Sequence, residues 1–599
     1  MDHKKPFAVL LLSSLILMLF IGVDGCNSGK ETDNSWQAPS EAANLKSPIQ
    51  ASPVVEQKGK ELYNLYCRSC HGENGFGDGA AGAAFEKKPS DFHKKRVKQQ
   101  PDGALFWKMS TGKGNMPAFK DALSEEQRWQ LVFYIRNLSD KEMPAKPPTA
   151  LRPDIKVEHF MKVGPSAVRI LQNTLSGDLY YTTFDGDVFR IRDLYSTQPK
   201  AEKILSVREH GITRLQGATF FNNILFLSGN VDATDKKSVK GRMVRYAFDS
   251  SGPKEMTVVF NTVSYGANKT IYDHGWNAME ISPDGKFIYV NSGARTDHGE
   301  VQDNGGLNPN ARDNALTSKI FRFPIDARDL ELKDDEQKLK TDGYIYAEGI
   351  RNAYDMAFDP DGNLFGVVNS SDYDHPEDMF WIRQSHHYGF PWIMGGIENP
   401  QQYPDWQPDP DTDPFINKFS HSWEVKYFHN DPDFPKIPKG LKFSPGVQNL
   451  GPDANEYRGH SGKILDGDET GVPVSTFTPH SSPLGLFFDT KKILAKDLKS
   501  DGFVIRYTLG SSGAMMRAFT NLGSDLLHLH LTYDSAMDNY FVRTTRIVEG
   551  FKEPTDAVMI GNEVYVIEYS GKEGNIWKIT LPKDERPTIA EKKNKKTKR

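Results

Sequence analysis

The sequence predicts a multidomain protein, with a small all-α domain followed by a long all-β domain. Three observations support this prediction. Between residues 54 and 140, apolar residues recur at helical spacing. From residue 155 to about residue 585, short β-rich runs alternate with turns that contain Gly, Asp or Asn. Between these regions, residues 141–154 include four prolines, which is typical of a semi-rigid linker.

The composition is that of a folded protein without a nucleic-acid partner. The chain has 599 residues, of which 11% are aromatic, and its formal net charge is −5. A negative net charge gives no sign of nucleic-acid binding. The only cysteines are Cys26, Cys67 and Cys70.

The N-terminus has the pattern of an export signal. Lys4 and Lys5 precede an apolar run from Ala8 to Val23, which is short of the roughly 20 residues needed to span a bilayer. The run ends before Cys26 in a pattern that resembles the lipobox of bacterial lipoproteins, although Asp24 departs from the usual small neutral residue. We therefore expect a lipoprotein-type signal peptide at residues 1–26, with the mature protein in the periplasm and lipid-anchored to a membrane through Cys26. A plain signal peptide or an uncleaved anchor are the alternatives.

Residues 27–53 are polar and lack periodicity. They predict a flexible tether between the anchor and the first domain.

The five residues from Cys67 to His71 form the pattern C-x-x-C-H. This pattern is the attachment signature of a c-type haem: the two cysteines add to the porphyrin vinyl groups and the histidine is the proximal iron ligand. A thioredoxin-like pair does not require the histidine. A zinc site would need a second C-x-x-C or H-x-x-x-H element, which the sequence lacks. We therefore predict haem c, held by Cys67 and Cys70 with His71 on the iron.

Residues 54–140 as a whole resemble a class I cytochrome c. A glycine-rich loop carries Met116 before Pro117, and a last helix opens with a capping box from Ser124 to Gln127. The resemblance implies that Met116 supplies the second axial ligand. Met109 is the competing methionine, but it lies within a helical pattern. His/Met ligation leaves no open iron position, so we expect an electron carrier.

The long C-terminal region repeats a unit of strand, tight turn and strand. The clearest copies are residues 176–191, 279–290, 356–367 and 557–566. Repeated hairpins of this kind predict a β-propeller with long inserted loops, with a pair of β-sandwiches as the alternative. After the last unit, the basic tail at residues 586–599 is expected to be disordered.

Short motifs between these units carry a second resemblance. They are Asp273-His274, Gly349-Ile-Arg351-Asn352, Pro376-Glu-Asp378, Tyr388-Gly-Phe-Pro391, His480 to Leu486, and Gly502 to Arg506. In this order they resemble the glucose/sorbosone dehydrogenase family, whose members are six-bladed propellers that hold pyrroloquinoline quinone (PQQ) and oxidise sugars. The resemblance spans roughly residues 160 to 580.

The resemblance implies roles for individual residues. His274 matches the general base, for which an imidazole is suited because its pKa lies near the operating pH. Arg351 and Asn352 match the pair that holds the quinone, where the Arg351 guanidinium would stabilise charge on a quinone oxygen or pair with a cofactor carboxylate. Asp273 is expected to contact the same cofactor, and Arg506 is a second cationic contact.

The resemblance also implies calcium, held in part by main-chain carbonyls of the loop that matches Asp372-Tyr373. Here that loop is acidic where the family tends to have Gly-Pro, so calcium is expected without assigned ligands. The adjacent residues His386 and His387 look like a metal-binding pair. Neighbouring residues on a strand point to opposite faces, however, so we expect these two at the surface. His480 is as consistent with supporting a turn as with chemistry.

The function expected from these features is that of an exported PQQ-dependent dehydrogenase. It would oxidise a sugar or related alcohol or aldehyde and pass electrons to its own haem, and then to a downstream acceptor such as a cytochrome or oxidase. One alternative is a propeller that has lost its quinone. Another is a membrane-tethered electron carrier whose propeller only binds glycans or a protein.

Overall fold

The computed structural model describes residues 36–50, 52–72, 75–77, 85, 88–140, 147–196, 198–249, 252–267, 270, 272–302, 311–472, 474–508, 519–521, 523–571 and 573–584. The predicted signal peptide, Cys26, residues 27–35 and 51 of the predicted tether and the basic tail lie outside these residues. The chain forms two compact units that divide after Pro144. No helix in the described ranges is both long enough and apolar enough to cross a membrane.

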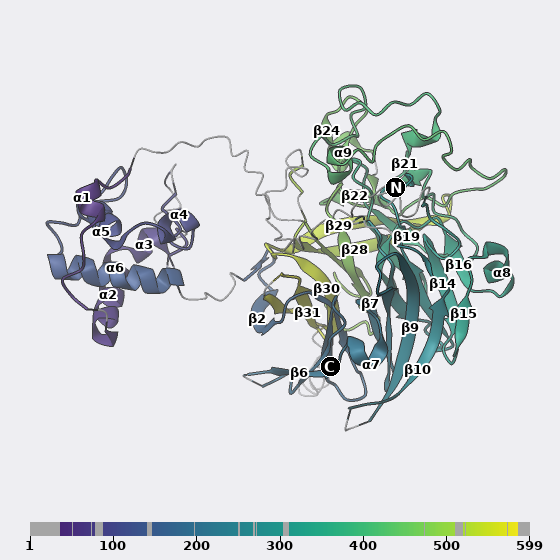
Figure 1. Ribbon diagram of the computed structural model, residues 1–599, viewed down its shortest axis with the longest axis horizontal. Helices are drawn as coiled ribbons and strands as arrows, with labels where there is room; N and C mark the ends of the chain where they lie inside the picture. The colour runs from purple at the N-terminus through teal and green to yellow at the C-terminus, as the bar shows by residue number, and fades with distance from the viewer. Residues whose placement is uncertain are drawn as a thin grey trace, which may run out of the picture. The chain divides into compact units, whose positions relative to one another are not determined.

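The N-terminal unit is helical (Figure 1). Its helices are α1 (Ser40–Ala43), α2 (Pro53–Tyr66), α3 (Arg68–His71), α4 (Lys95–Lys98), α5 (Asp102–Thr111) and α6 (Glu125–Asp140). The predicted capping box forms at the start of α6, where the Gln127 amide donates to Ser124 Oγ at 3.2 Å and the Ser124 amide donates to Gln127 Oε1 at 2.8 Å. The reciprocal bonds satisfy two backbone donors that a helix start otherwise leaves open.

Helices α2 and α6 contact one another closely at Gly59. A Cβ atom at this position would lie 2.3 Å from the Gln130 carbonyl oxygen and 2.8 Å from Tyr134 Cβ. Only glycine therefore permits this approach. The aromatic residues Phe106, Phe119, Trp129 and Tyr134 are buried, and the rings of Phe106 and Trp129 stack with centroids 4.4 Å apart.

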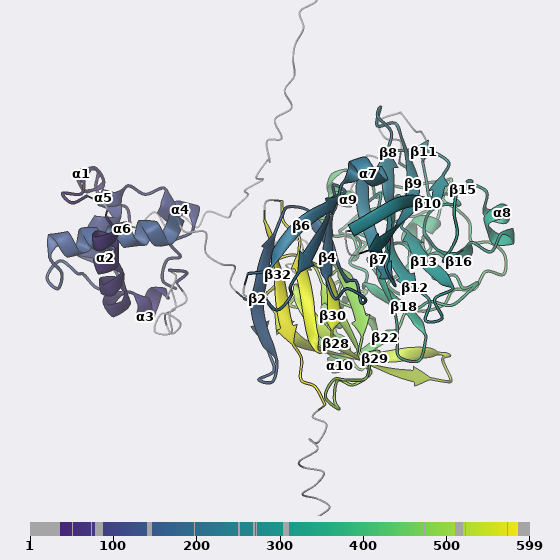
Figure 2. The same ribbon diagram turned by 90° about the horizontal axis from the view of Figure 1, so that it is seen from below.

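The C-terminal unit contains, among its described residues, six sheets of three or more strands (Figures 1 and 2). The first is β3 (Ala167–Gln172), β4 (Leu179–Thr183), β5 (Val188–Arg192) and β6 (Lys200–Leu205). The second is β7 (Arg214–Phe221), β8 (Ile224–Asp232), β9 (Ser238–Asp249) and β10 (Gly252–Thr262), extended by β11 (Tyr265–Gly266) and β15 (Leu330–Leu332). The third is β12 (Trp276–Ile281), β13 (Phe287–Ser292), β14 (Lys319–Pro324) and β16 (Ile345–Glu348).

The remaining three sheets complete the unit. The fourth is β17 (Ala353–Phe358), β18 (Leu364–Val368) and β19 (Asp378–Trp381). The fifth is β26 (Pro483–Phe488), β27 (Gly502–Arg506), β28 (Asp525–Asp534) and β29 (Asn539–Glu549), with β22 (Gln448–Pro452) and β25 (Val474–Ser475) beyond β29. The sixth is β30 (Pro554–Ile560), β31 (Glu563–Glu568), β32 (Gly574–Thr580) and β2 (Lys156–Val163).

The first strands of these sheets close into a ring. Strands β3, β7, β12, β17, β26 and β30 contact one another in that order, and β30 returns to contact β3. Strand β2 is the first long strand of the propeller unit, and it pairs with β32, the last strand. The last blade is therefore completed by a strand from the start of the unit. The predicted β-propeller is confirmed, and the pair of β-sandwiches is excluded, because six sheets surround one axis.

The predicted repeat units form hairpins within these blades. Residues 279–290 become β12 and β13, and residues 356–367 become β17 and β18. The turn glycines Gly285 and Gly362 have φ of 69° and 86°, a backbone region that glycine enters without a steric penalty.

A buried ionic group fills the centre of the ring. The Arg169 guanidinium on β3 lies 3.7 Å from the carboxylates of Asp355 on β17 and Asp556 on β30. Its Nε donates to the Gln216 carbonyl on β7 at 2.7 Å. Burial raises the pKa of Asp556 to about 7. One arginine therefore connects four of the six blades.

The linker is shorter than predicted. The short strand β1 (Thr149–Ala150) pairs with β29, and Arg152 Nη1 lies 2.8 Å from Asp497 Oδ2. Residues from Thr149 onward are thus attached to the propeller. The proline pattern could not show this, because the pairing strand lies some 400 residues further along the chain.

The chain between β19 and β26 forms a long insertion. It contains β20 (Ile393–Met394), β21 (Ile397–Glu398), η2 (Pro400–Gln402), α9 (His421–Glu424), β23 (Glu456–Arg458), β24 (Ile464–Asp466) and α10 (Gly467–Thr470). The other helices of the propeller unit are α7 (Val207–His210) and α8 (Glu336–Thr341).

Candidate functional site

The histidine of the C-x-x-C-H motif is oriented for metal ligation. Cys67 ends α2 and His71 ends α3, so the motif forms a compact turn. His71 Nδ1 donates to the Ser90 carbonyl oxygen at 3.1 Å, and its ring stacks on Phe92 at a centroid distance of 4.7 Å. Burial lowers the pKa of His71. The ring is therefore held neutral with Nε2 as the lone-pair nitrogen, which is the arrangement that an iron ligand needs.

The two cysteines are unbonded thiols that flank this turn. Burial raises the pKa of Cys67 to about 12, and the nearby Cys70 thiol adds a smaller effect in the same direction. Two unpaired thiols beside an oriented histidine fit covalent attachment of a haem. The residues that would hold it are those predicted from the motif.

Met116 and Met109 occupy different environments. Met109 is on α5 with 3% of its surface exposed. Met116 is in a tight turn, where its backbone N–H and C=O bond to Lys113 at 3.1 and 2.9 Å. It packs on the edge of the same apolar core as Cys67. The structure thus places Met116 in a loop that packs on the same core as Cys67, and its ligand role stays a prediction.

His274 lies directly before β12 and is tied to the loop that follows β13. Both its backbone N–H and its Nδ1 donate to the Ala294 carbonyl oxygen, at 3.1 and 2.9 Å. Burial, with the nearby Arg351 charge, lowers the pKa of His274 to about 3. The imidazole is therefore neutral, and Nε2 is its proton-accepting nitrogen. The expectation that the pKa of His274 lies near the operating pH is wrong, because the ring is buried beside a cation.

Arg351 and Asn352 lie directly before β17 and converge with His274 on the same loop. The Ala294 N–H donates to the Arg351 carbonyl oxygen at 2.6 Å. A Cβ atom on Gly293 would lie 2.6 Å from His274 Cβ and 2.8 Å from Asn352 Oδ1. The three predicted residues therefore surround one glycine at one end of the propeller, since all the first strands of the blades start at that end.

The Arg351 side chain is fixed by Asp297, a residue that the sequence analysis did not single out. Arg351 Nε donates to the Asp297 carbonyl at 2.7 Å, and Nη2 donates to its carboxylate at 3.0 Å. Asp297 is fully buried and also accepts from Ser422 Oγ at 2.8 Å and from the Asp372 backbone N–H at 3.1 Å. Hydrogen bonds and the Arg351 charge lower the pKa of Asp297 to about 2 against the effect of burial. It is a permanent anion that joins Arg351 to the insertion.

The Asn352 amide belongs to a buried network of amides. Its Oδ1 accepts from Asn277 at 2.8 Å and from Asn291 at 3.4 Å. Its Nδ2 donates to Asn369 Oδ1 at 3.0 Å, which leaves one N–H for any ligand. Asn352 is thus rigidly held between blades.

Arg506 is separate from this group. Its Nε and Nη2 donate to both oxygens of Asp525 at 2.9 and 2.6 Å, and Nη1 donates to Ser481 Oγ at 2.9 Å. It is fully buried. A guanidinium committed to a bidentate carboxylate has its charge compensated within blade five, and the predicted cofactor contact by Arg506 has no support from this geometry.

Asp273 offers unmet hydrogen-bonding capacity beside His274. Its Oδ2 is 3.5 Å from Arg214 Nη2, whereas its buried Oδ1 has no hydrogen-bond partner. Within the described residues, Arg214 Nε and Asn230 Nδ2 are buried and unpartnered as well. Burial raises the pKa of Asp273. Unpaired buried donors beside a neutral imidazole fit a polyanionic quinone with hydrogen-bonding edges.

The predicted calcium loop is occupied by its own hydrogen bonds. Asp372 Oδ2 accepts from Tyr272 Oη at 2.6 Å and from the Ser422 backbone N–H at 2.8 Å. In the described ranges, no group of three or more His, Cys, Asp or Glu side chains is arranged to hold a metal ion. Calcium stays a prediction.

Three further histidines, His480, His386 and His387, contact other residues of the propeller. His480 Nε2 lies 2.7 Å from Asp374 Oδ1, and hydrogen bonding to that carboxylate raises its pKa against burial. His386 Nδ1 lies 2.7 Å from Ser444 Oγ. His387 packs against Gly349 and Trp392, so this pair is only partly at the surface.

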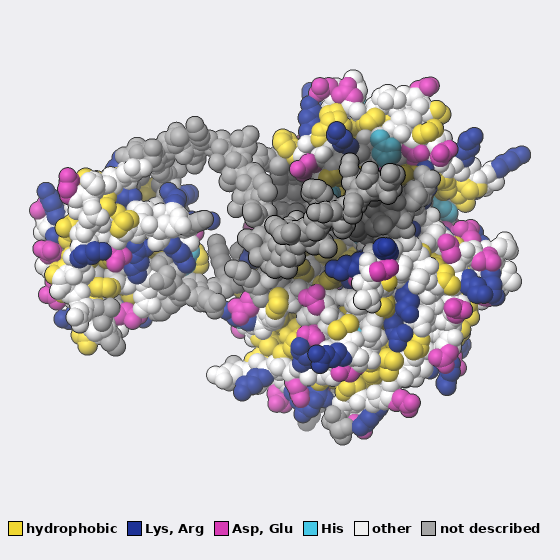
Figure 3. Space-filling view, in the orientation of Figure 1, with side chains coloured by type: hydrophobic (Ala, Val, Ile, Leu, Met, Phe, Trp, Pro, Cys, Tyr) yellow, Lys and Arg dark blue, Asp and Glu magenta, His cyan; other side chains and the backbone are white. Residues whose placement is uncertain are grey.

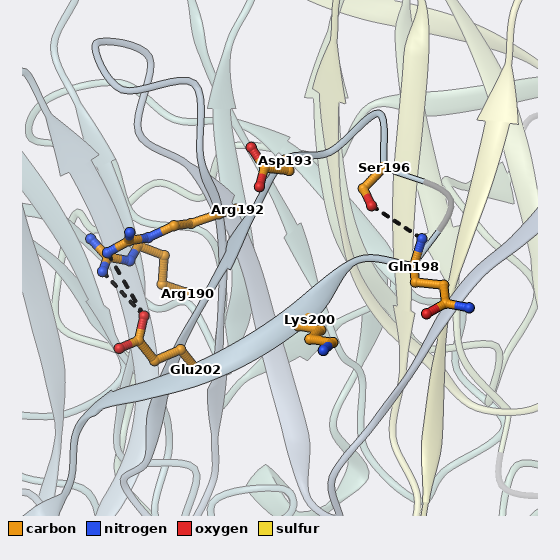
Figure 4. Close-up of a pocket in the computed structure, with 7 residues that line it drawn as sticks. All are labelled: Arg190, Arg192, Asp193, Ser196, Gln198, Lys200 and Glu202. Carbon is orange, nitrogen blue, oxygen red and sulfur yellow. Dashed lines mark hydrogen bonds and ion pairs between the residues drawn. The ribbon is translucent and has the colours of Figure 1, made fainter.

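A polar pocket of about 220 Å³ lies on the outer strands of the first blade (Figure 4). It is lined by Arg190, Arg192, Asp193, Ser196, Gln198, Lys200 and Glu202. Glu202 pairs with Arg190 and Arg192. None of the predicted site residues lines this pocket.

Comparison with known proteins identifies the helical unit. Residues 55–135 match the family model described as cytochrome C oxidase, cbb3-type, subunit III. No curated protein matches the chain. The N-terminal unit is therefore a cytochrome c domain, as predicted, and it is followed by a β-propeller.

Similar solved structures cover the propeller. They include the PQQ domain of pyranose dehydrogenase from Coprinopsis cinerea, with 12% identity over 73% of this chain and 98% of that chain and a TM-score of 0.43. The soluble aldose sugar dehydrogenase from Escherichia coli has 13% identity over 71% and 99%, with a TM-score of 0.44. A PQQ-bound aldose sugar dehydrogenase from Streptomyces coelicolor has 13% identity over 72% and 99%, with a TM-score of 0.40.

Proposed function

We propose that this chain is a quinoprotein dehydrogenase that oxidises a sugar or a related alcohol or aldehyde and transfers the electrons to its own cytochrome c domain. The observation that carries the proposal is the convergence of His274, Arg351 and Asn352 on Gly293. All three residues belong to the motifs by which the sequence resembles the glucose/sorbosone dehydrogenase family. Scattered residues would not meet at one glycine.

The residues have separable tasks in this reaction. When bound, PQQ supplies two-electron oxidation and haem c supplies one-electron transfer. Oxidation of an alcohol to a carbonyl releases two electrons and two protons, and His274 Nε2 is placed to accept the hydroxyl proton. Arg351, fixed by Asp297, presents its charge next to His274. Asp273 and Arg214 offer the unpaired polar atoms that would bind the cofactor.

Joining the carrier to the dehydrogenase in one chain has a physical advantage. A short linker raises the effective concentration of one domain at the other to roughly millimolar. Electron transfer to a tethered acceptor is then independent of protein concentration.

A second function is supported by a different observation. The donors of Arg506 and most of those of Asn352 are already used within the protein. A propeller that binds no quinone must satisfy its buried donors with its own residues, and these donors are satisfied in that way. The second candidate is therefore an electron carrier whose propeller only binds a glycan or a protein.

Reconstitution separates the two functions. We would add PQQ to the full chain, with and without Ca²⁺, and measure sugar-dependent reduction of an artificial dye. The dehydrogenase predicts dye reduction that falls about 10²- to 10⁴-fold in His274→Ala, with the exposed His530→Ala as the control. Failure to bind PQQ under both conditions would leave the carrier function.

The location of the protein is a further part of the proposal. The pattern at Cys26 supports export and lipid attachment outside the cytoplasm. Metabolic labelling with a radioactive fatty acid tests it: wild type should be labelled and found in the membrane fraction. Cys26→Ser should be unlabelled, and equal labelling of both proteins would contradict the anchor.

A further inference from the structure

The three nitrogens of the Arg351 guanidinium all bind oxygen atoms of the protein. Nε donates to the Asp297 main-chain carbonyl at 2.7 Å, and Nη2 donates to the Asp297 carboxylate at 3.0 Å. Nη1 donates to the Asn369 main-chain carbonyl at 3.0 Å. We call these three acceptors the oxygen cluster. Main-chain carbonyls and carboxylates are the hard oxygen ligands that Ca²⁺ prefers, and here a buried cation of the protein already binds them.

The Asp297 carboxylate uses its lone pairs on four donors. Arg351 Nη2 and the Asp372 backbone N–H bond to Oδ1 at 3.0 and 3.1 Å. Ser422 Oγ donates to Oδ2 at 2.8 Å, and His298 Nδ1 lies 3.0 Å from the same oxygen. A carboxylate offers about four lone-pair sites. A metal ion could therefore bind Asp297 only by displacing a buried donor, which would then lose its partner.

The loop at Asp372-Tyr373 is fastened by hydrogen bonds to two other parts of the propeller unit. Asp372 Oδ2 accepts from Tyr272 Oη at 2.6 Å and from the Ser422 backbone N–H at 2.8 Å. Ser422 lies on α9 of the insertion, and Tyr272 lies two residues before His274. A bound metal ion stabilises a fold because it joins ligands from separate segments. At this loop, protein donors make connections of that kind.

The surface of the insertion is mixed in charge. Where Figure 1 labels α9 and β24, Figure 3 shows acidic and basic side chains interspersed. A surface lined by one sign of charge concentrates counter-ions. The face seen in Figure 3 therefore does not single out this region for a divalent cation.

We propose that the Arg351 guanidinium supplies, at the oxygen cluster, the positive charge that the family resemblance assigns to calcium, so that this chain binds its quinone without a calcium ion. A divalent ion on the same oxygens would lie next to a fixed guanidinium, and like charges at short range repel strongly in a buried site. Nη1 and Nη2 each keep one further N–H for a ligand. The inference rests on the proposed function for the identity of the site.

The first experiment measures calcium binding by the full chain without quinone. Protein dialysed against EGTA is unfolded thermally with and without millimolar Ca²⁺, because a ligand that binds the native state raises the midpoint. The wild-type midpoint should not change, and calorimetric titration with CaCl₂ should show no saturable binding. A raised midpoint together with saturable binding at one site would overturn the proposal.

The second experiment removes the guanidinium. Arg351→Ala leaves the oxygen cluster without its cation and should lower the midpoint. Ca²⁺ should then raise the midpoint of this variant, whereas Mg²⁺ should not, because Mg²⁺ needs octahedral geometry at shorter distances. A folded Arg351→Ala protein that does not respond to Ca²⁺ would contradict the assignment of these oxygens to a cation. If the variant does not fold, the wild-type titration decides alone.

The matched control is Arg383→Ala. It removes a guanidinium that pairs with the exposed Asp538 at 2.6 Å. Its midpoint should respond to neither ion. A calcium response equal to that of Arg351→Ala would mean that the oxygen cluster is not its source, and would overturn the proposal.

The third experiment asks whether the cofactor brings its own need for calcium, as an ion held mainly by cofactor oxygens would. PQQ is titrated into wild type in Ca²⁺ and in EGTA, and binding is followed by quenching of tryptophan fluorescence. The two dissociation constants should agree within about twofold, because sites that are not coupled leave each other's affinity unchanged. Binding about tenfold tighter in Ca²⁺ would overturn the inference and leave the proposed function standing. No binding in either condition would contradict the proposed function, while the calcium titration without quinone would still decide this inference.

Discussion

In the cytochrome c domain, Cys67, Cys70 and His71 are neighbours in the chain, and the carbonyl that orients His71 is 19 residues away. In the propeller, Arg351 depends on Asp297 at a distance of 54 residues, and Asp297 binds Ser422 at a distance of 125. The first site needs only a helical turn and one loop. The second exists only when blades and insertion have closed around it, so perturbations should affect the two regions differently.

The largest effect is expected at the local site. His71→Ala removes the proximal ligand, and the haem absorption spectrum should lose its low-spin His-ligated form or disappear. His93→Ala is the matched control in the same domain, because His93 bonds to Asp91 and to the Leu138 carbonyl instead. Dye reduction by the PQQ-loaded propeller should survive in both variants. Loss of that activity in His71→Ala would show that the two regions are not independent.

The propeller site should respond to loss of a single buried charge. Asp297→Asn leaves the Arg351 guanidinium buried without its anion, which costs about 3–5 kcal/mol of folding stability. Asp538→Asn removes the exposed partner of Arg383 and should cost less than about 1 kcal/mol. Urea unfolding of the two variants measures the difference. Equal stability would mean that Asp297 does not hold the propeller site together.

A smaller effect is expected where α2 and α6 cross. Gly59→Ala places a methyl group 2.3 Å from the Gln130 carbonyl oxygen. Overpacking of this kind costs about 1–3 kcal/mol, which outweighs the gain of up to about 1 kcal/mol from helix propensity. Gly164→Ala in the propeller meets no atom within 4 Å and should change stability by less than about 0.5 kcal/mol. Thermal unfolding of each protein checks both values, and a stabilised Gly59→Ala would contradict the close crossing.

No effect of pH on His274 is expected near neutrality. Its pKa is lowered from 6.5 to about 3, so the ring is neutral above pH 4 and becomes protonated only below that. Ring nitrogen shifts of ¹⁵N-histidine-labelled protein, with the His274 signal assigned by its loss in His274→Ala, should stay at neutral values from pH 8 to pH 5. A midpoint near 6.5 would show that the ring is not buried beside Arg351 as described.

The capping box at Ser124 could be predicted from the sequence because it depends on residues within one helical turn, and it is confirmed. The C-x-x-C-H spacing is equally local, and the haem ligands assigned from it stay a prediction. The propeller could be predicted as a fold because each hairpin carries its own turn signal. Its closure by β2 on β32 had no local signal.

The contents of the propeller site were only partly predictable. His274, Arg351 and Asn352 were found because short motifs contain them. Asp297 was missed because three of its partners, Arg351, Asp372 and Ser422, lie on distant loops. Arg506 lies in a motif, but the sequence could not show that Asp525 on the next strand takes up its charge.

The most direct test of the account is reduction of the haem by substrate within a single chain. Full-length protein loaded with PQQ and Ca²⁺ would be mixed rapidly with sugar while the haem α-band is recorded. The account predicts reduction at a rate that does not change when the protein is diluted tenfold, and no reduction in His274→Ala. A haem that stays oxidised in a PQQ-loaded protein that still reduces dye would contradict it.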